Sequence, residues 1–289
     1  MKPENLKTKK EITWCPGCSN FMILKAFTEA VSELVNEKKV KAQDTAVVTG
    51  IGCHAKIYDY LDLKGFNGLH GRVLPICLGM KLGNPKMTVI GFGGDGDTYN
   101  EGMAHFIHNC RYNSDFTMAV HNNQVFSLTT GQATATSEKG FVDKSIPLGV
   151  AEKPLNPIAL ALEAGATFLA RGYALAVPYL KNIFKEAILH KGFSFIDILQ
   201  PCLIYHNVIP YFQKNVYKLG ESHDTQNLER ALQKAREWDY CFNKDQKVPI
   251  GIFYQTERPT FESQWPQLKK PWYVIQRRIN WQNVIKEFK

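Results

Sequence analysis

Residues 87–97, MTVIGFGGDGD, are the stretch that predicts the fold most directly. The stretch begins as an apolar run of strand length and ends in a glycine-rich turn that carries Asp95 and Asp97. Residues 45–53, TAVVTGIGC, follow the same plan, because a second apolar run ends in a glycine turn that closes with Cys53. Short apolar runs that stop at glycine turns are typical of buried strands. We therefore expect two buried strands that each end in a functional loop.

Helical and strand patterns alternate along the rest of the chain. Apolar residues at helical spacing predict a helix over residues 20–35. Further helices are expected over about 99–112, 158–164 and 180–190, and further strands over 116–120, 167–171 and 193–199. This alternation predicts an α/β fold with a doubly wound, mostly parallel sheet and right-handed crossovers. Ligands of such sheets bind at the carboxyl ends of the strands, where the glycine turns fall.

Asp95 and Asn123 form a candidate cation site. Asn123 follows the next apolar strand and lies 28 residues after Asp95. Because the two loops are expected at adjacent strand ends, a carboxylate and an amide oxygen there can bind one hard cation that also holds a diphosphate. The glycines allow backbone amides to approach the phosphates, and the following helix adds its positive end. The alternative is structural, with Asp95 as a helix cap and residues 122–123 as a turn.

The composition and the absence of long apolar segments favour a soluble cytoplasmic protein over a secreted or membrane protein. A chain of 289 residues with 44% hydrophobic residues suits one large domain or two small ones. Its start lacks the apolar segment of a signal peptide, and no apolar run reaches membrane-spanning length, so we expect a soluble cytoplasmic protein. The net charge of +8 is compatible with acidic partners such as a ferredoxin, with nucleic acid or anionic cofactors, or with a basic solvated surface.

The seven cysteines are odd in number, which argues against a disulfide scaffold and for metal or redox use. Cys15 and Cys18 form a C-x-x-C pair, but its Pro-Gly order is reversed from the thioredoxin pattern and no strand precedes it. Cys53 and Cys202 both follow predicted strands. Four thiolates from these positions suit either a [4Fe-4S] cluster or tetrahedral zinc, which spacing does not separate. The remaining cysteines, Cys77, Cys110 and Cys241, are interpreted as packing thiols.

The Gly-Asp-Gly turn and the later asparagine resemble the diphosphate-binding domain of thiamine-diphosphate enzymes. The resemblance implies magnesium bound by the Asp95 carboxylate, the Asn123 side chain and the backbone carbonyl of Val125. A wider set of segments makes it more specific and covers roughly residues 12–260. These segments are WCPGC (14–18), GIGC (50–53), HGRVLP (70–75), GDGD (94–97), HFIH (105–108), LTTGQ (128–132), FSFIDILQPC (193–202) and FY (253–254). Together they resemble the β subunit of 2-oxoacid:ferredoxin oxidoreductases, closer to the 2-oxoglutarate and broad-specificity group than to the pyruvate-specific group.

The family resemblance implies a set of cofactor-binding residues. It implies one [4Fe-4S] cluster held by Cys15, Cys18, Cys53 and Cys202, and thiamine diphosphate bound against Ile51, Gly52, Cys53, His54, Gly96, Asp97, Ser127 and Leu128. Arg72 is a further expected contact near the cofactor or substrate carboxylate, with a surface or interface arginine as the alternative. His54 stands where the family usually has Ser, Ser19 where it usually has Gly, and residues 126–127 where Tyr-Gly is common.

The resemblance also implies the reaction and the partners. The implied reaction is the coenzyme A-dependent oxidative decarboxylation of a 2-oxoacid, 2-oxoglutarate or pyruvate, to acyl-CoA and CO2, with electrons passed through the cluster to ferredoxin. No catalytic acid or base is assigned in this chain. The carboxylate that activates the cofactor is expected on a separate α subunit, or α/γ subunit, within an αβ or (αβ)2 assembly. The alternatives are a non-redox thiamine-diphosphate decarboxylase half with structural zinc, and a noncatalytic electron-transfer module.

Two regions are expected along the chain. Residues 1–240 are predicted to bind thiamine diphosphate, Mg²⁺ and the cluster, and residues 241–289 to form an extension that packs on this domain or on a partner subunit. Basic and aromatic residues interleave over residues 263–289, as they do on some nucleic-acid surfaces. No recognised nucleic-acid motif accompanies them, so neither nucleic acid nor a membrane is an expected partner.

Overall fold

The computed structural model describes residues 1–242, 246–275 and 279–288. Its main feature is an eight-stranded sheet with the strand order β2-β1-β3-β4-β8-β7-β10-β9. The strands are β1 (Thr45–Thr49), β2 (Lys64–Asn67), β3 (Thr88–Gly94), β4 (Phe116–Asn122), β7 (Phe168–Tyr173), β8 (Phe193–Leu199), β9 (Val216–Lys218) and β10 (Val248–Gln255). A separate two-stranded hairpin joins β5 (Val125–Phe126) to β6 (Gln132–Ala133). All neighbours in the main sheet pair in parallel except β7 and β10. The predicted mostly parallel α/β class is therefore confirmed.

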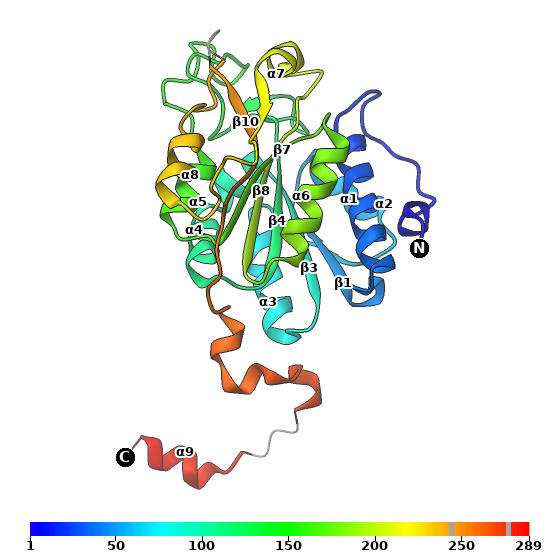
Figure 1. Ribbon diagram of the computed structural model, residues 1–289, viewed down its shortest axis with the longest axis vertical. Helices are drawn as coiled ribbons and strands as arrows, with labels where there is room; N and C mark the ends of the chain where they lie inside the picture. Colours follow the sequence, from blue (N-terminus) through cyan, green and yellow to red (C-terminus); the bar gives the residue numbers. More distant parts are fainter. Residues whose placement is uncertain (243–245, 276–278, 289) are drawn as a thin grey trace.

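Helices cover both faces of the sheet, as a doubly wound fold requires (Figure 1). The α-helices are α1 (Asn20–Asn36), α2 (Ile57–Tyr60), α3 (Val73–Gly83), α4 (Met103–Tyr112), α5 (Pro157–Glu163), α6 (Val177–Leu189), α7 (Ile209–Asn215), α8 (Leu228–Ala235) and α9 (Trp281–Glu287). Helices α1 and α6 pack together on one face, whereas α3, α4, α5 and α8 lie on the other. No helix in the described part of the chain is both long and apolar enough to span a membrane. The cytoplasmic location stays a prediction.

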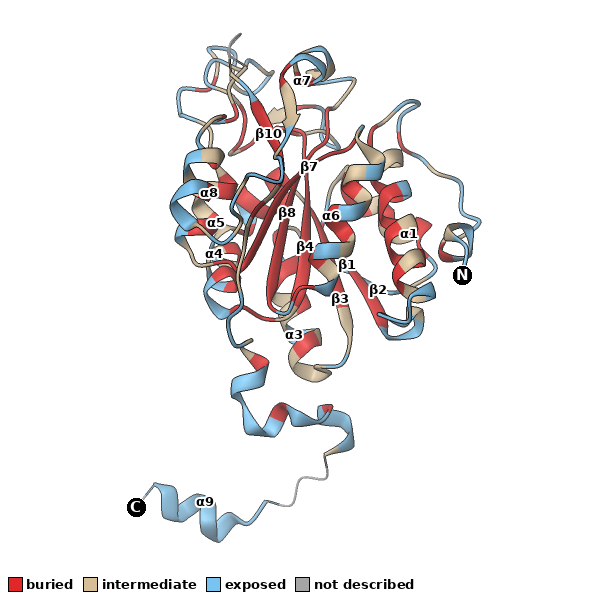
Figure 2. Cartoon of the chain, viewed as in Figure 1, coloured by how far each residue is buried: buried red, intermediate tan, exposed pale blue. Residues whose placement is uncertain are grey.

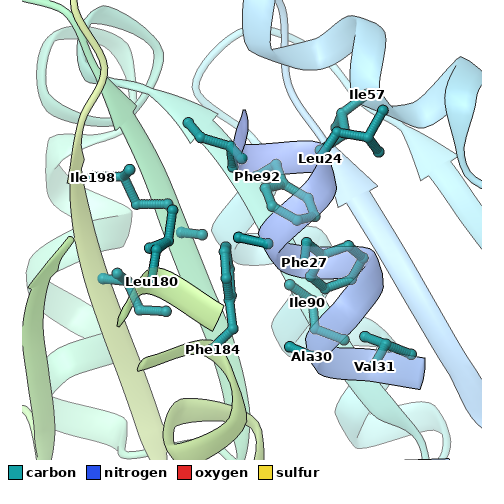
Figure 3. Close-up of a cluster of buried hydrophobic side chains, with 14 of the residues drawn as sticks. Leu24, Phe27, Ala30, Val31, Ile57, Ile90, Phe92, Leu180, Phe184 and Ile198 are labelled. Atoms are coloured by element: carbon teal, nitrogen blue, oxygen red, sulfur yellow. The ribbon is translucent and has the colours of Figure 1, made fainter. Parts of the chain in front are cut away.

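The core beneath α1 and α6 fixes the end of β3, from which the Gly-Asp-Gly turn starts. Phe92 on β3 packs edge-to-face on Phe27 of α1, with ring centroids 5.0 Å apart, and Phe27 packs in the same way on Phe184 of α6, at 5.5 Å (Figure 3). All three rings are fully buried. Such aromatic pairs add about 0.5–1.5 kcal/mol each beyond their burial. The position of the turn is therefore set by a rigid apolar cluster directly before it.

Two predicted helices begin at other residues than expected. The helix expected from residue 99 begins as α4 at Met103, because residues Gly96–Glu101 form a π-helical turn (labelled η4) directly after the Gly-Asp-Gly motif. A π-helical turn widens the backbone and is frequent at functional sites. The helix expected from residue 180 begins as α6 at Val177, since Pro178 is tolerated in the first turn of a helix.

The sheet extends beyond the expected domain boundary at residue 240. β10 lies between β7 and β9, so the first part of the region 241–289 is a strand of the domain itself. β10 is also largely buried. After β10, Arg258 and Glu262 still hydrogen-bond to residues 110–115 of the domain. Most of the described residues beyond them lie away from the sheet and are exposed (Figure 2). Packing of that segment on a partner subunit stays a prediction.

Candidate functional site

The turn after β3 has room only for glycine at two positions. A Cβ atom on Gly96 would come within 2.1 Å of the Phe126 ring, and one on Gly94 would come within 2.8 Å of His54 Nδ1. Real Cβ atoms essentially never approach other atoms so closely. The glycines therefore allow the loops after β1, β3 and β4 to meet around one small space.

Asp95 projects from this turn into a buried, neutral environment. Only 2% of the residue is exposed. The hydroxyls of Thr134 and Thr136 donate to its Oδ2 at 2.5 and 3.2 Å, and the backbone N–H of Asn123 donates to its Oδ1 at 3.4 Å. Burial raises the pKa of Asp95 to about 6, and the hydroxyls only partly oppose this shift. A buried carboxylate whose partners are all neutral is stabilised by a bound cation. The two threonines were not predicted, because no spacing signal connects them to Asp95.

Asn123 and Val125 complete the predicted magnesium ligands. The Asn123 Nδ2 group donates to Gln200 Oε1 at 2.9 Å and to Ser127 Oγ at 3.3 Å, and its Oδ1 accepts from the Val125 N–H at 3.1 Å. Asp95, Asn123 and Val125 line one cavity. Carboxylate, amide and carbonyl oxygens are the ligands that Mg²⁺ prefers. The residues present therefore fit a hard cation. Across the described ranges, no three His, Cys, Asp or Glu side chains converge as ligands of a single metal ion, and the four predicted cluster cysteines share a cavity and not such a point.

This first cavity, which we call the diphosphate cavity, lies at the carboxyl ends of β1, β3 and β4 and is open to solvent, with about 470 Å³ of empty space including its mouth. Its lining contains Ile51, Gly52, Cys53, His54, His70, Gly94, Asp95, Gly96, Asp97, His121, Asn123, Val125, Phe126, Ser127, Leu128, Thr129 and Gln200. The cavity brings together every cofactor contact predicted from the sequence except Arg72. The Arg72 side chain is exposed and donates to the backbone carbonyls of Gly71 and Glu101 at 3.1 and 3.2 Å. The arginine therefore braces the start of α3 and does not line the cavity.

Asp97 holds two loops of this cavity together. Its Oδ1 accepts from the Gly71 N–H at 2.7 Å. His54 Nε2 lies 3.4 Å from Oδ2, and His70 Nδ1 lies 3.5 Å from Oδ1. In the described part of the chain, these two ring nitrogens and Asp97 Oδ2 are buried without a hydrogen-bond partner. Buried polar atoms without partners are costly, so this wall is suited to a polar ligand. His70 was quoted in the HGR segment but was not predicted as a cavity residue.

A second cavity, which we call the cysteine cavity, gathers the four predicted cluster ligands. It has about 500 Å³ of empty space, which includes its solvent-open mouth. The lining comprises Thr13, Trp14, Cys15, Cys18, Asn20, Cys53, Lys56, Asn123, Ser127, Gln200, Cys202, Leu203, Ile204 and Tyr205. The Trp14 indole N–H donates to the Cys53 carbonyl at 2.7 Å, which ties the N-terminal segment to the turn after β1. Segments far apart in sequence therefore present four thiols to one space.

Burial favours the protonated form of two of these four thiols. Burial raises the pKa of Cys18 to about 11, and the nearby thiolates of Cys53, Cys202 and Cys15 raise it further. Burial likewise raises the pKa of Cys53. Cys18 and Cys53 therefore stay protonated near neutral pH unless a bound cation replaces their protons. Cys77 and Cys110, in contrast, are fully buried in the apolar core on the α3 and α4 side, which confirms their interpretation as packing thiols. Cys241 is partly buried.

The two cavities share a wall. Cys53, Asn123, Ser127 and Gln200 line both of them. A group bound in the diphosphate cavity is therefore separated from the cysteine cavity by single side chains. This adjacency suits electron transfer between two bound cofactors.

Comparisons with known proteins agree with this geometry. Residues 50–198 match the family model of the thiamine pyrophosphate enzyme, C-terminal TPP binding domain, and residues 205–270 match that of the C-terminal part of the pyruvate ferredoxin oxidoreductase beta subunit. The chain is 42% identical over 277 residues to the 2-oxoacid:ferredoxin oxidoreductase subunit beta of Saccharolobus solfataricus, covering 90% of this chain and 87% of the relative. It is 38% identical over 197 residues to the 2-oxoglutarate synthase subunit KorB of Archaeoglobus fulgidus, covering 68% and 72% of the two chains.

A solved structure is similar over the whole length. The 2-oxoglutarate:ferredoxin oxidoreductase from Magnetococcus marinus, described with 2-oxoglutarate, coenzyme A and succinyl-CoA bound, superposes with a TM-score of 0.89. The sequence identity is 29%, and the match covers 100% of this chain and 96% of that chain. Together with the thiamine pyrophosphate-binding domain and the matched β subunits, this likeness shows that the chain belongs to the β subunits of the 2-oxoacid:ferredoxin oxidoreductase family, which are oxidoreductase subunits.

Proposed function

We propose that this chain binds thiamine diphosphate through Mg²⁺ in the diphosphate cavity and a [4Fe-4S] cluster in the cysteine cavity. With an α subunit, in an αβ or (αβ)2 assembly, it converts a 2-oxoacid and coenzyme A to acyl-CoA and CO2, and ferredoxin receives the electrons. The observation that carries the proposal is the wall of Cys53, Asn123, Ser127 and Gln200 that the two cavities share. Oxidative decarboxylation needs a carbanion-stabilising group and an electron acceptor at close range, and bound thiamine diphosphate supplies the first.

The side chains of the diphosphate cavity bind and orient. Asp95, Asn123 and the Val125 carbonyl would hold Mg²⁺, and the glycine turn offers backbone amides to the phosphates at the start of the π-helical turn. Asp97 keeps the neighbouring loops in place through the Gly71 N–H. His54 Nε2 and His70 Nδ1, which face the Asp97 carboxylate without a hydrogen bond, supply polar groups at the cavity wall.

The cysteine cavity provides a route from this site to the surface. Cys53 lines the wall shared with the diphosphate cavity, whereas Cys15 is exposed. A cluster held by the four thiolates would therefore reach from the cofactor side to solvent. Ile204 and Tyr205, which are exposed at the rim of this cavity, give an electron carrier an apolar surface to contact. The net charge of +8 favours an acidic carrier such as ferredoxin.

The substrate class is proposed from the relatives. The matched β subunits are named for 2-oxoacids and 2-oxoglutarate, and the solved structure is described with 2-oxoglutarate and coenzyme A. We propose 2-oxoglutarate or pyruvate as the substrate. The carboxylate that activates the cofactor is proposed to come from the α subunit.

The decisive experiment is cofactor analysis of the αβ complex after anaerobic co-expression. We expect about four irons and four acid-labile sulfides per β chain, with a brown colour that dithionite bleaches. We also expect bound thiamine diphosphate, and reduction of ferredoxin that depends on both 2-oxoacid and coenzyme A. Zinc without sulfide would overturn the redox assignment in favour of a decarboxylase half. Iron and sulfide without thiamine diphosphate would leave only an electron-transfer module.

A further inference from the structure

Gln200 occupies the wall between the two cavities. It directly follows β8, only 2% of it is exposed, and its side chain lines both the diphosphate cavity and the cysteine cavity. Its backbone N–H donates to the Asn122 carbonyl at 2.8 Å, which extends the pairing of β8 with β4 by one residue. The backbone of Gln200 is therefore fixed by the sheet, and its side chain is held between two sites.

The two ends of the Gln200 amide bind different partners. Oε1 accepts from Asn123 Nδ2 at 2.9 Å, and Nε2 donates to Ser19 Oγ at 2.8 Å. A glutamine amide is acceptor at one atom and donor at the other, so this pair of contacts sets its orientation. Both partners are also buried, with Asn123 8% and Ser19 2% exposed. Gln200 Nε2 also donates to the Pro201 carbonyl at 3.3 Å, so the amide is held on the cysteine side by two acceptors.

On the diphosphate side, the contact with Gln200 is the shortest of the three hydrogen bonds that orient the Asn123 amide, the others being to Ser127 and from Val125. The Asn123 Nδ2 group points to Gln200 Oε1 and Ser127 Oγ, so its Oδ1 is directed away from them. A metal ion requires that oxygen, because the NH2 group cannot act as a ligand. Hydrogen bonds that orient a ligand in this way typically change metal affinity by about 10–100-fold when removed.

On the cysteine side, the contact joins two segments that carry thiols. Ser19 directly follows Cys18, and its hydroxyl donates to the carbonyl of Pro201 at 3.0 Å, next to Cys202. Gln200 Nε2 donates to this same hydroxyl. The hydroxyl thus receives one hydrogen bond and donates another, and it ties the Cys18 segment to the Cys202 segment.

We propose that Gln200 is a positioning residue that couples the two sites, so that filling of the cysteine cavity strengthens binding of thiamine diphosphate and Mg²⁺, and the reverse. This inference rests on the proposed function. A group bound to Cys18 and Cys202 would fix the position of the Ser19 hydroxyl between them. That hydroxyl holds the Gln200 amide, and Gln200 in turn holds the Asn123 amide. A coupling free energy between two binding sites is reciprocal, and it commonly corresponds to a 5–150-fold change in affinity.

The test measures the dissociation constant of thiamine diphosphate, at fixed Mg²⁺, for the αβ complex in two forms. One form carries the cluster, and the other has been depleted of iron with a chelator and then returned to Mg²⁺ buffer. For the unmodified complex we expect binding to be about tenfold tighter with the cluster present, and reconstitution of the cluster to restore it. In Gln200→Ala and Ser19→Ala we expect this ratio to fall below about twofold.

Two matched variants control for loss of a side chain as such. Ser32→Ala removes another buried serine hydroxyl on α1, which donates to the Met1 carbonyl, and Gln213→Ala removes an exposed glutamine on α7. Both should keep the ratio of the unmodified complex. If Gln200→Ala does not assemble, Ser19→Ala decides, because it removes both hydrogen bonds of the Ser19 hydroxyl and keeps the contact between Gln200 and Asn123.

The results that would overturn this inference differ from the results that would overturn the proposed function. An unchanged ratio in Gln200→Ala or Ser19→Ala would overturn the coupling role. So would equal affinities of the loaded and depleted unmodified complex. If the unmodified complex bound no thiamine diphosphate or no iron, the proposed function itself would be wrong.

Discussion

The backbone N–H of Asn123 donates a 3.4 Å hydrogen bond to Oδ1 of Asp95, although 28 residues separate the two in sequence. They meet because β3 and β4 pair in parallel and end together, with Gly94 opposite His121. A carboxylate and an amide thereby reach one cavity from two loops, as the sequence spacing predicted.

Replacement of Asp95 should therefore remove cofactor binding and spare the cluster. We expect Asp95→Ala to weaken binding of thiamine diphosphate with Mg²⁺ by at least about 100-fold. Loss of a direct metal ligand should weaken binding more than loss of a residue that only orients a ligand. Isothermal titration of the αβ complex, with iron determined in parallel, measures both effects. Asp224→Asn, at an exposed aspartate, is the control. Unchanged affinity in Asp95→Ala would refute the metal assignment.

The cysteines should separate into two groups. Cys202→Ala should lose iron and sulfide, because Cys202 lines the cysteine cavity. Cys110→Ala should keep both, because Cys110 lies in the apolar core, and should cost only about 1 kcal/mol in stability. Iron analysis and the visible spectrum of anaerobic preparations distinguish these outcomes. Full iron content in Cys202→Ala would contradict the ligand set.

A buried ionic network should stabilise the sheet behind the site. Asp197 is fully buried and accepts from the Tyr240 hydroxyl at 2.6 Å and the Tyr99 hydroxyl at 3.0 Å, with Arg171 Nε 3.9 Å away. We expect Tyr240→Phe to lower the free energy of unfolding by about 1–3 kcal/mol, since it removes a hydrogen bond to a buried charged group. Urea unfolding followed by circular dichroism measures this change. Tyr273→Phe, at an exposed tyrosine, should lie within about 0.5 kcal/mol of the unmodified chain.

His190 should make stability depend on pH. Burial lowers its pKa below the ordinary value of 6.5, and its Nε2 lies 2.8 Å from Thr167 Oγ1. Above pH 6.5 the ring is neutral in both states. As the pH falls below that value, His190 takes up a proton more readily in the unfolded chain than in the folded chain. The contribution of neutral His190 to the free energy of unfolding therefore declines. The stability difference between the unmodified chain and His190→Asn should shrink by up to about 1.4 kcal/mol per pH unit until the pKa of the folded state is passed. Urea unfolding at several pH values measures this difference. A difference that did not vary with pH would contradict the prediction.

The C-terminal segment should contribute to subunit association. Trp281, Ile285 and Phe288 are 66%, 53% and 86% exposed around α9. Burial of such side chains on a partner is favourable by roughly 25 cal/mol per Å². We expect removal of residues 279–289 to weaken association with the α subunit by about tenfold or more, a loss of about 1.4 kcal/mol. Sedimentation of the two subunits over a concentration series tests this, with the melting temperature of the β chain as control. Equal association of the shortened chain would assign the segment another role.

Several elements escaped the sequence patterns for local reasons. β2 is a four-residue edge strand whose residues are all exposed. Its sequence therefore lacks the alternation of apolar and polar residues that indicates a half-buried strand. Helix α3 contains Pro75 and Gly79, and strand β10 contains Pro249 and Gly251, so the sequence pattern of each element is weak although both are continuous. These residues weaken helix and strand propensity, and the packing around each element overrides that weakness.

The sequence by itself predicted the α/β class, the two glycine turns, the strand-end positions of Asp95 and Asn123, and Cys53 and Cys202 after predicted strands as candidate partners of the Cys15–Cys18 pair. These features are local, because short apolar runs report buried strands and the residues that follow them lie at strand ends. Only the tertiary structure decided the remaining contacts. It brought Thr134 and Thr136 to Asp95, directed Arg72 away from the cavity, and placed Gln200 between Asn123 and Ser19. Hydrogen bonds between segments up to 181 residues apart depend on how strands order in the sheet, and no local pattern encodes that order.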